Sequence, residues 1–102
     1  MEVRSLPQAG AYALEGELDM ATVDGFLAGL RDAPQDGDLV LNVSNLTFVD
    51  SLGLRAILRV ARGRNHGSSV VLKDPTPSVM RLLSIALPGG APGVRVDRSA
   101  DV

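Results

Sequence analysis

The sequence predicts a single α/β domain built on a mixed, mostly parallel β-sheet, with an antiparallel strand at one edge and about three helices. Apolar runs of strand length alternate along the chain with segments of helical periodicity, which is typical of a parallel sheet with helical crossovers. Two strand-like segments separated only by a turn precede the first helix and add the antiparallel edge. With 102 residues, 45% of them apolar, residues 1–102 suffice for one core and are too few for two domains.

The first half of the chain contains the predicted hairpin, a helix and a strand. Strands are expected over residues 2–6 and 11–15, joined by the turn Pro7-Gln8-Ala9-Gly10. Asp19 is expected to be the N-cap of the first helix, because it stands just before apolar residues at helical spacing: Met20, Val23, Phe26, Leu27 and Leu30. Residues 32–37 interrupt this helix, and residues 39–43 form a mostly apolar run of strand length.

The second half continues the alternation. A helix of about 13 residues begins at Asp50-Ser51 and carries an apolar stripe of Leu54, Ile57, Leu58 and Ala61. Residues 69–73 are expected to form a buried strand, and Thr76 followed by Pro77 begins a third helix that runs through Ala86. A loop over residues 88–93 then leads to a last short strand over residues 94–96.

The composition excludes several classes of function. The chain has no cysteine and only one histidine, His66, so it can build neither a thiol nucleophile nor a zinc cluster of the usual kind. A formal net charge of −2 and the absence of tryptophan argue against nucleic-acid binding. Neither a secretory leader nor an apolar run of membrane-spanning length is visible. We therefore expect a cytoplasmic protein with no membrane contact and no metal or other cofactor.

The charges are unevenly distributed along the chain. Up to and including Asp50 there are nine carboxylates and two basic residues, a net charge of −7. From Ser51 onward there are three carboxylates and eight basic residues, a net charge of +5. The two halves of the chain are therefore expected to attract each other.

The most informative residues stand at the start of the second helix. Asp50 and Ser51 are both residue types that cap helices, so either side chain can accept a backbone N–H of the first turn. Gly53 lies in that turn, although glycine lowers helix propensity by up to about 1 kcal/mol relative to alanine. A first turn without a side chain beside a serine is expected to leave room for another protein to approach the hydroxyl.

Two segments resemble the anti-sigma factor antagonist branch of the sulphate transporter and anti-sigma factor antagonist (STAS) domains. They are Gly16-Glu17-Leu18-Asp19, after the second strand, and Asp50-Ser51-Leu52-Gly53-Leu54, after the third. The spacing between the two segments and the order of the elements also agree with that family. The resemblance implies a STAS-type domain and a binding protein with no enzymatic activity of its own.

The resemblance also implies how such a protein works. The serine that directly follows the aspartate, here Ser51, is phosphorylated in that family by the anti-sigma factor, an ATP-dependent serine kinase. The unphosphorylated antagonist binds the anti-sigma factor and frees the sigma factor, whereas the phosphorylated form is released; a phosphatase would reset the state. ATP would belong to the partner.

The sequence departs from the family pattern at three places, one of which is the atypical connection Pro88-Gly89-Gly90-Ala91-Pro92-Gly93. Leu52 stands where a hydroxyl residue often follows the phosphoacceptor, so a second acceptor is absent. Family members usually carry a further helix after the last strand, and only Arg98 to Val102 remain here. We therefore expect a final C-terminal helix that is short or absent.

The second helix indicates where a partner would bind. Ser51, Arg55, Arg59 and Arg62 lie on the side opposite the apolar stripe. Leu52 is expected to act as an apolar anchor, with Arg55 and Arg59 pairing with partner carboxylates and Arg55 also within reach of a phosphate on Ser51. By resemblance, the loop at Asp19 lies beside the loop at Asp50-Ser51. The predicted partner-binding residues are Asp19, Asp50, Ser51, Leu52, Gly53, Arg55 and Arg59.

Three alternatives remain open from the sequence. The arginines are also compatible with an ordinary solvated helix face. The protein could be a STAS scaffold, or an accessory subunit of a transporter or signalling complex, in which Ser51 only caps a helix. A small enzyme using Asp50 and Ser51 is the third alternative, although no positioned base accompanies them.

Overall fold

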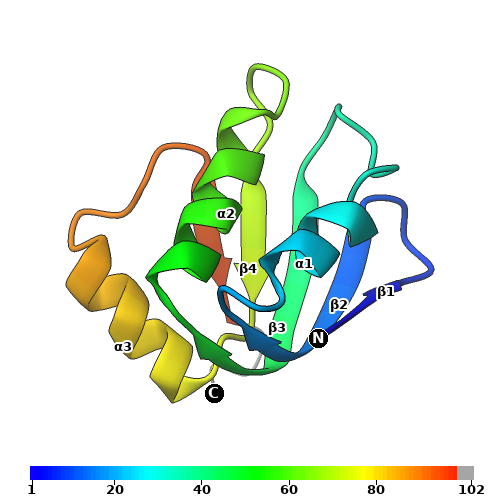
Figure 1. Ribbon diagram of the computed structural model, residues 1–102. Helices are drawn as coiled ribbons and strands as arrows, with labels where there is room; N and C mark the ends of the chain where they lie inside the picture. Colours follow the sequence, from blue (N-terminus) through cyan, green and yellow to red (C-terminus); the bar gives the residue numbers. More distant parts are fainter. Residues whose placement is uncertain (99–102) are drawn as a thin grey trace.

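The computed structural model describes residues 1–98, whose five strands form one sheet in the order β1-β2-β3-β4-β5 (Figure 1). The strands are β1 (Glu2–Ser5), β2 (Ala11–Leu18), β3 (Leu39–Val49), β4 (Val70–Lys73) and β5 (Val94–Asp97). The helices are α1 (Val23–Gly29), α2 (Ser51–Arg62) and α3 (Pro77–Ala86). β1 pairs with β2 in antiparallel orientation and the other three pairs are parallel. The predicted fold class is therefore confirmed.

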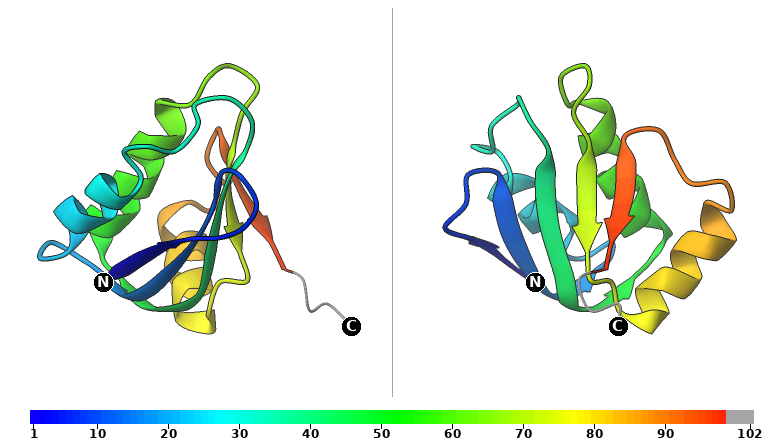
Figure 2. Two further views of the ribbon diagram at one scale, coloured as in Figure 1. Left: turned by 90° about the vertical axis from the view of Figure 1, so that its right-hand side faces the viewer. Right: turned by 180° about the vertical axis from the view of Figure 1, so that it is seen from behind.

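Helices α1 and α2 lie together against one face of the sheet, and α3 lies beyond the edge formed by β5 (Figures 1 and 2). Alternate residues of β3 explain which face is covered: Leu39, Leu41 and Val43 are buried in the core, whereas Val40 and Asn42 are only half-buried. Phe26 and Ile57 bury their side chains in the same core from α1 and α2. The helices thus supply the second layer that the apolar face of the sheet requires.

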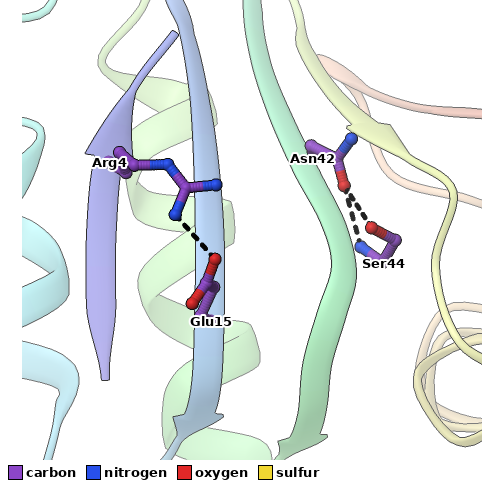
Figure 3. A network of polar contacts seen from close by, with 4 residues as sticks. All are labelled: Arg4, Glu15, Asn42 and Ser44. Atoms are coloured by element: carbon purple, nitrogen blue, oxygen red, sulfur yellow. Dashed lines mark hydrogen bonds and ion pairs between the residues drawn. The ribbon is translucent and has the colours of Figure 1, made fainter.

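The opposite face of the sheet carries polar side chains (Figure 3). Arg4 on β1 forms an ion pair of 2.8 Å with Glu15 on β2. On β3, the Asn42 side-chain oxygen accepts hydrogen bonds from the backbone N–H of Ser44 at 3.0 Å and from its hydroxyl at 2.7 Å. These pairs make this a solvated face rather than a second core.

Two strands are longer than predicted. β2 continues to Leu18 and β3 to Val49, and their pairing runs on through Glu17 with Phe48 and Leu18 with Val49. The register shifts twice along this pair, once between Ala13 and Glu15 and again between Gly16 and Glu17. Such irregularities break the alternation of buried and exposed residues by which a strand is recognised. Residues 16–18, expected to follow the second strand, therefore belong to it.

The prediction that Asp19 caps the first helix is wrong. α1 begins at Val23 with Thr22 as its N-cap, and no side chain accepts a hydrogen bond there. The Asp19 carboxylate instead accepts the N–H of Ala21 at 3.0 Å, which forms a turn before the helix. Met20, expected on the buried face of the helix, lies in this turn and is 72% exposed.

The remaining elements agree with the sequence predictions in order and type. Thr76 caps α3, because its hydroxyl accepts the N–H of Val79 at 3.3 Å, and Pro77 occupies the first turn as expected. None of the helices in the described part of the chain is both long and apolar enough to cross a membrane. The expectation of a short or absent final helix concerns residues after 98 and lies outside the described residues.

Candidate functional site

Two loops meet at the end of the sheet where β2 and β3 terminate. The backbone N–H of Asp50, after β3, donates to the carbonyl oxygen of Leu18 at the end of β2, at 3.1 Å. The backbone N–H of Met20 donates to Oδ2 of Asp50 at 3.2 Å. The loop that contains Asp19 therefore lies beside the loop that contains Asp50 and Ser51, as the sequence analysis expected.

Asp50 caps α2. Its backbone is extended, with φ −96° and ψ −177°, and Oδ1 accepts the N–H of Gly53 at 2.8 Å. Because Oδ2 accepts the N–H of Met20, one carboxylate holds both loops in place. Of the two capping candidates, the helix uses the aspartate.

Ser51 is the first residue of α2 and is exposed. Within residues 1–98, its hydroxyl takes part in no hydrogen bond, whereas the neighbouring Asp50 supplies the cap. The interpretation of Ser51 as merely a helix cap is therefore wrong. The hydroxyl lies free at the N-terminal end of a helix, where the unpaired backbone N–H groups and the helix dipole favour negative charge.

Gly53 is buried, and the reason for a glycine here differs from the one expected. A Cβ atom at this position would lie 2.5 Å from the carbonyl oxygen of Leu18 and 2.8 Å from its Cγ. The missing side chain lets the first turn of α2 pack directly on the end of β2. The interpretation that Gly53 leaves room for a visiting protein is thus wrong, and Gly53 can contribute to a partner surface only by positioning Ser51 and Leu52.

The outer side of α2 carries the predicted arginines. Arg55 and Arg59 are exposed, and neither forms an ion pair with any residue from 1 to 98. Leu52, in the first turn, is 38% exposed despite its apolar side chain. An exposed leucine between a free hydroxyl and unpaired guanidinium groups is a surface suited to a protein partner.

A groove of about 200 Å³ runs between α1 and α2 beside Ser51. Leu52, Arg55 and Arg59 line it from α2, together with Val23, Asp24 and Leu27 from α1. Sequence reasoning did not find the contribution of α1, because Val23 and Leu27 have the spacing of ordinary core residues. Only the packing of the two helices reveals that they also border an open groove.

Met20 is a second residue that sequence reasoning missed. Its backbone is fixed to Asp50, one residue from Ser51, and its side chain is 72% exposed. The apolar side chain of Met20 was the one sign in the sequence of a contact residue, but its helical spacing with the residues that follow placed it in the core. Methionine adapts its shape readily to a partner, so it extends the apolar part of the surface around Ser51.

The described residues around Ser51 include carboxylates but no cluster of metal ligands. Residues 1–98 contain no group of three or more His, Asp or Glu side chains placed to hold a metal ion. Asp19 and Asp50 use carboxylate oxygens to accept backbone N–H groups. The site presents the free hydroxyl of Ser51 on a surface of mixed apolar and basic character.

Comparisons with known proteins agree with this fold. A family model described as "Mlab, STAS domain" matches residues 1–87. The crystal structure of a candidate anti-sigma factor antagonist from Thermotoga maritima has a TM-score of 0.70 at 19% identity, covering 97% of this chain and 86% of that one. The anti-sigma factor antagonist SpoIIAA in its unphosphorylated form has a TM-score of 0.68 at 21% identity, covering 96% and 88%. At these identities, the two structures establish a common fold.

Proposed function

The chain belongs to the STAS domain family, and we propose that it is an anti-sigma factor antagonist that phosphorylation of Ser51 switches off. The observation that carries this proposal is the exposed Ser51 hydroxyl, which is free of hydrogen bonds within residues 1–98 while Asp50 caps the helix. Two proteins of the same fold support it: SpoIIAA, which is an anti-sigma factor antagonist, and the Thermotoga maritima protein, which is a candidate anti-sigma factor antagonist. The protein would act in the cytoplasm, where it would meet the anti-sigma factor.

In the unphosphorylated state, the surface around Ser51 binds the anti-sigma factor and so frees the sigma factor. Leu52 and Met20 supply exposed apolar contacts, with Leu52 at the rim of the groove between α1 and α2. Arg55 and Arg59 pair with carboxylates of the partner, which fixes its orientation. Asp50 and Asp19 shape the two loops through backbone hydrogen bonds and hold Ser51 at the centre of the contact.

Phosphorylation transfers the γ-phosphoryl group of ATP, held by the partner kinase, to Oγ of Ser51, and the hydroxyl proton leaves to a base of the kinase. This chain supplies the acceptor and no catalytic group. The phosphate adds about −1.5 to −2 charges, which the N-terminal end of α2 tolerates. Arg55 lies one turn further along the same helix and can pair with the phosphate.

The switch operates at the interface rather than through refolding of the domain. A partner packed over Ser51 would have to accommodate both the bulk and the charge of a phosphate against its own apolar and acidic groups. A loss of about 3 kcal/mol in the free energy of binding weakens a complex more than a hundredfold. This is enough to release the anti-sigma factor.

The proposal is tested with purified protein, ATP and the serine-kinase anti-sigma factors of the same genome. Peptide mapping is expected to find an added mass of about 80 Da on Ser51, the mass of one phosphoryl group. The Ser51→Ala variant should bind the anti-sigma factor and stay bound when ATP is added, whereas Ser51→Asp should bind weakly without ATP. Arg62→Ala is a matched control on α2 that lies outside the groove. Phosphate on another residue, or none with every kinase, would overturn the proposal.

A second candidate function retains the STAS fold but involves no phosphorylation of Ser51. The protein would then be a scaffold, or an accessory subunit of a transporter or signalling complex. The matched family model is compatible with it, because the STAS family takes its name from sulphate transporters as well as from anti-sigma factor antagonists. If no kinase modifies Ser51 and a transporter subunit co-purifies equally with the native protein and with Ser51→Ala, this second candidate is the correct one.

A further inference from the structure

The free edge of β5 lies far from Ser51 in the sequence and takes no part in the site described above. The carbonyl oxygens of Gly93 and Asp97 accept N–H groups of β4 and of the residue after it, at 2.7 Å from Val70 and 2.8 Å from Asp74. Because residues of a parallel strand alternate in the direction of their hydrogen bonds, the N–H and C=O of Val96 point away from the sheet. The N–H of Val94, which also points outward, already donates to the carbonyl oxygen of Ala91 at 3.1 Å, so the groups of Val96 are those that another strand could use.

An apolar trough lies between this edge and α3. It has a volume of about 260 Å³, and its walls include Leu83 from α3, Leu87 just after that helix, and Val94 and Val96 from β5. The side chain of Val96 is 42% exposed, although it is apolar. Figure 2 shows α3 standing beyond β5, so the trough is bounded by a strand on one side and a helix on the other. This is the geometry in which an extended peptide adds a strand to a sheet.

One end of the trough is basic. A neighbouring hollow shares Met80 and Ser84 with the trough and is also lined by Arg81 and Arg98. Neither arginine forms an ion pair with a residue between 1 and 98. Acidic groups would therefore complement this end of the trough, while apolar side chains complement its walls.

We propose that the trough between β5 and α3 binds an extended, acidic segment of a partner protein as a sixth strand of the sheet. Backbone groups of the segment bond to the N–H and C=O of Val96, alternate apolar side chains enter the trough, and a carboxylate pairs with Arg81 or Arg98. A second copy of this chain fits less well. Each copy carries α3 beyond its β5 edge, so two helices would meet where a peptide brings none (Figure 2).

The test uses the full chain and a fluorescein-labelled peptide of about ten residues in which valine and glutamate alternate. A peptide with lysine in place of glutamate is the charge control. Fluorescence anisotropy should detect binding of the glutamate peptide and much weaker binding of the lysine peptide. Amide NMR shifts caused by the glutamate peptide should map to Val94–Asp97 and α3.

Variants separate the parts of the proposed contact. Arg81→Glu combined with Arg98→Glu should weaken binding about tenfold or more, since the attraction between the peptide carboxylates and this end of the trough becomes repulsion. Arg31→Glu, an exposed arginine outside both hollows, should leave binding unchanged. Val96→Pro removes the outward N–H and should abolish binding, whereas Val96→Thr keeps that N–H and should retain most of it.

Three results would overturn the proposal: equal binding of the two peptides, no effect of the arginine reversals, or NMR shifts that map to α2. Self-association seen by sedimentation and lost in Val96→Pro would assign the edge to a second copy and overturn it as well. Thermal unfolding checks that each variant is folded. Phosphorylation of Ser51 should be the same in the variant with both Arg81→Glu and Arg98→Glu as in the native protein, so failure here is distinguishable from failure of the proposed function.

Discussion

Gly53 packs against the backbone of Leu18 in a space that is too small for any side chain. A Cβ atom there would be 2.5 Å from the carbonyl oxygen of Leu18, whereas a Cβ atom at Gly25 in α1 would meet nothing within 4 Å. The two glycines both lie in helices, yet they have opposite surroundings. Substitution of each glycine by alanine therefore separates the effect of the contact with β2 from the effect of helix propensity.

Gly53→Ala is expected to lower the free energy of unfolding by about 2 kcal/mol or more, because the first turn of α2 must move away from β2. Gly25→Ala is expected to raise it by about 0.5 to 1 kcal/mol, through helix propensity alone. Urea unfolding measures both changes. A stabilising Gly53→Ala would contradict the packing described here.

Asp50 uses its two carboxylate oxygens for two different loops. Asp50→Ala is expected to lower the free energy of unfolding by about 1 to 2 kcal/mol, because the backbone N–H groups of Gly53 and Met20 both lose the carboxylate oxygen to which they donate. Asp50→Asn keeps one oxygen for the cap but turns an N–H group toward Met20, so it should cost about half as much.

Urea unfolding measures these costs, and amide hydrogen exchange at Met20 should accelerate in both variants. Asp32→Ala removes an exposed carboxylate that makes no hydrogen bond within residues 1–98, and it should change stability by less than about 0.5 kcal/mol. Equal stability of all three variants would show that the hydrogen bonds of the Asp50 carboxylate do not stabilise the fold.

At the scale of elements, the end of α2 is tied to the loop between α1 and β3. Arg64, just after α2, donates from its two terminal nitrogens to the carbonyl oxygens of Pro34 and Gly37, the latter at 2.6 Å. The next residue adds a backbone hydrogen bond of 3.4 Å from the N–H of Asn65 to the carbonyl oxygen of Gln35. These bonds hold the start of β3 at the end of the sheet opposite Ser51.

Arg64→Met should lower the free energy of unfolding by about 1 kcal/mol, since the aliphatic stem remains and water can replace part of the lost hydrogen bonding. Hydrogen exchange should accelerate in residues 35–38 and remain unchanged around Ser51. Arg62→Met, an exposed arginine with no hydrogen bond within residues 1–98, is the control and should have little effect. Exchange that increases equally in both variants would contradict this role of Arg64.

At the scale of the whole molecule, the acidic first half and the basic second half are in contact through the sheet. An ion pair of 3.1 Å between Arg95 and Asp38 joins the two halves, and both side chains are exposed, at 61% and 38%. The other ion pair, between Arg4 and Glu15, lies within the first half. The attraction between the halves is therefore mostly long-range and easily screened.

A tenfold increase in NaCl from a low-salt buffer should lower the free energy of unfolding by less than about 1 kcal/mol. Asp38→Asn should reduce this salt dependence, because it removes the carboxylate that faces Arg95. Urea unfolding at the two salt concentrations gives both values. A fall of several kcal/mol would mean that charge pairing contributes much more to the fold than the structure indicates.

The residues whose roles were predicted correctly from the sequence are those whose roles depend on neighbours a few positions away in the chain. Asp50 caps α2 and Thr76 caps α3 because a capping side chain bonds to an N–H only three residues ahead. Asp19 has the same residue type and the same apolar periodicity after it, yet α1 begins three residues later than the cap would require. Residues 19–22 instead form a turn in which the N–H of Met20 bonds to the Asp50 carboxylate, thirty positions along the chain, and a local pattern cannot show that contact.

The sequence by itself determined the α/β class, the order of the eight elements and the position of Ser51 at the start of a helix, because propensity, capping and periodicity act over a few residues. Tertiary structure alone decided that Leu18 occupies the space beside Gly53, that Met20 is exposed, and that α1 and α2 enclose a groove. These features depend on contacts between residues 25 or more positions apart, as between Leu18 and Gly53. Chain folding brings such residues together, and no short segment of sequence encodes their distance.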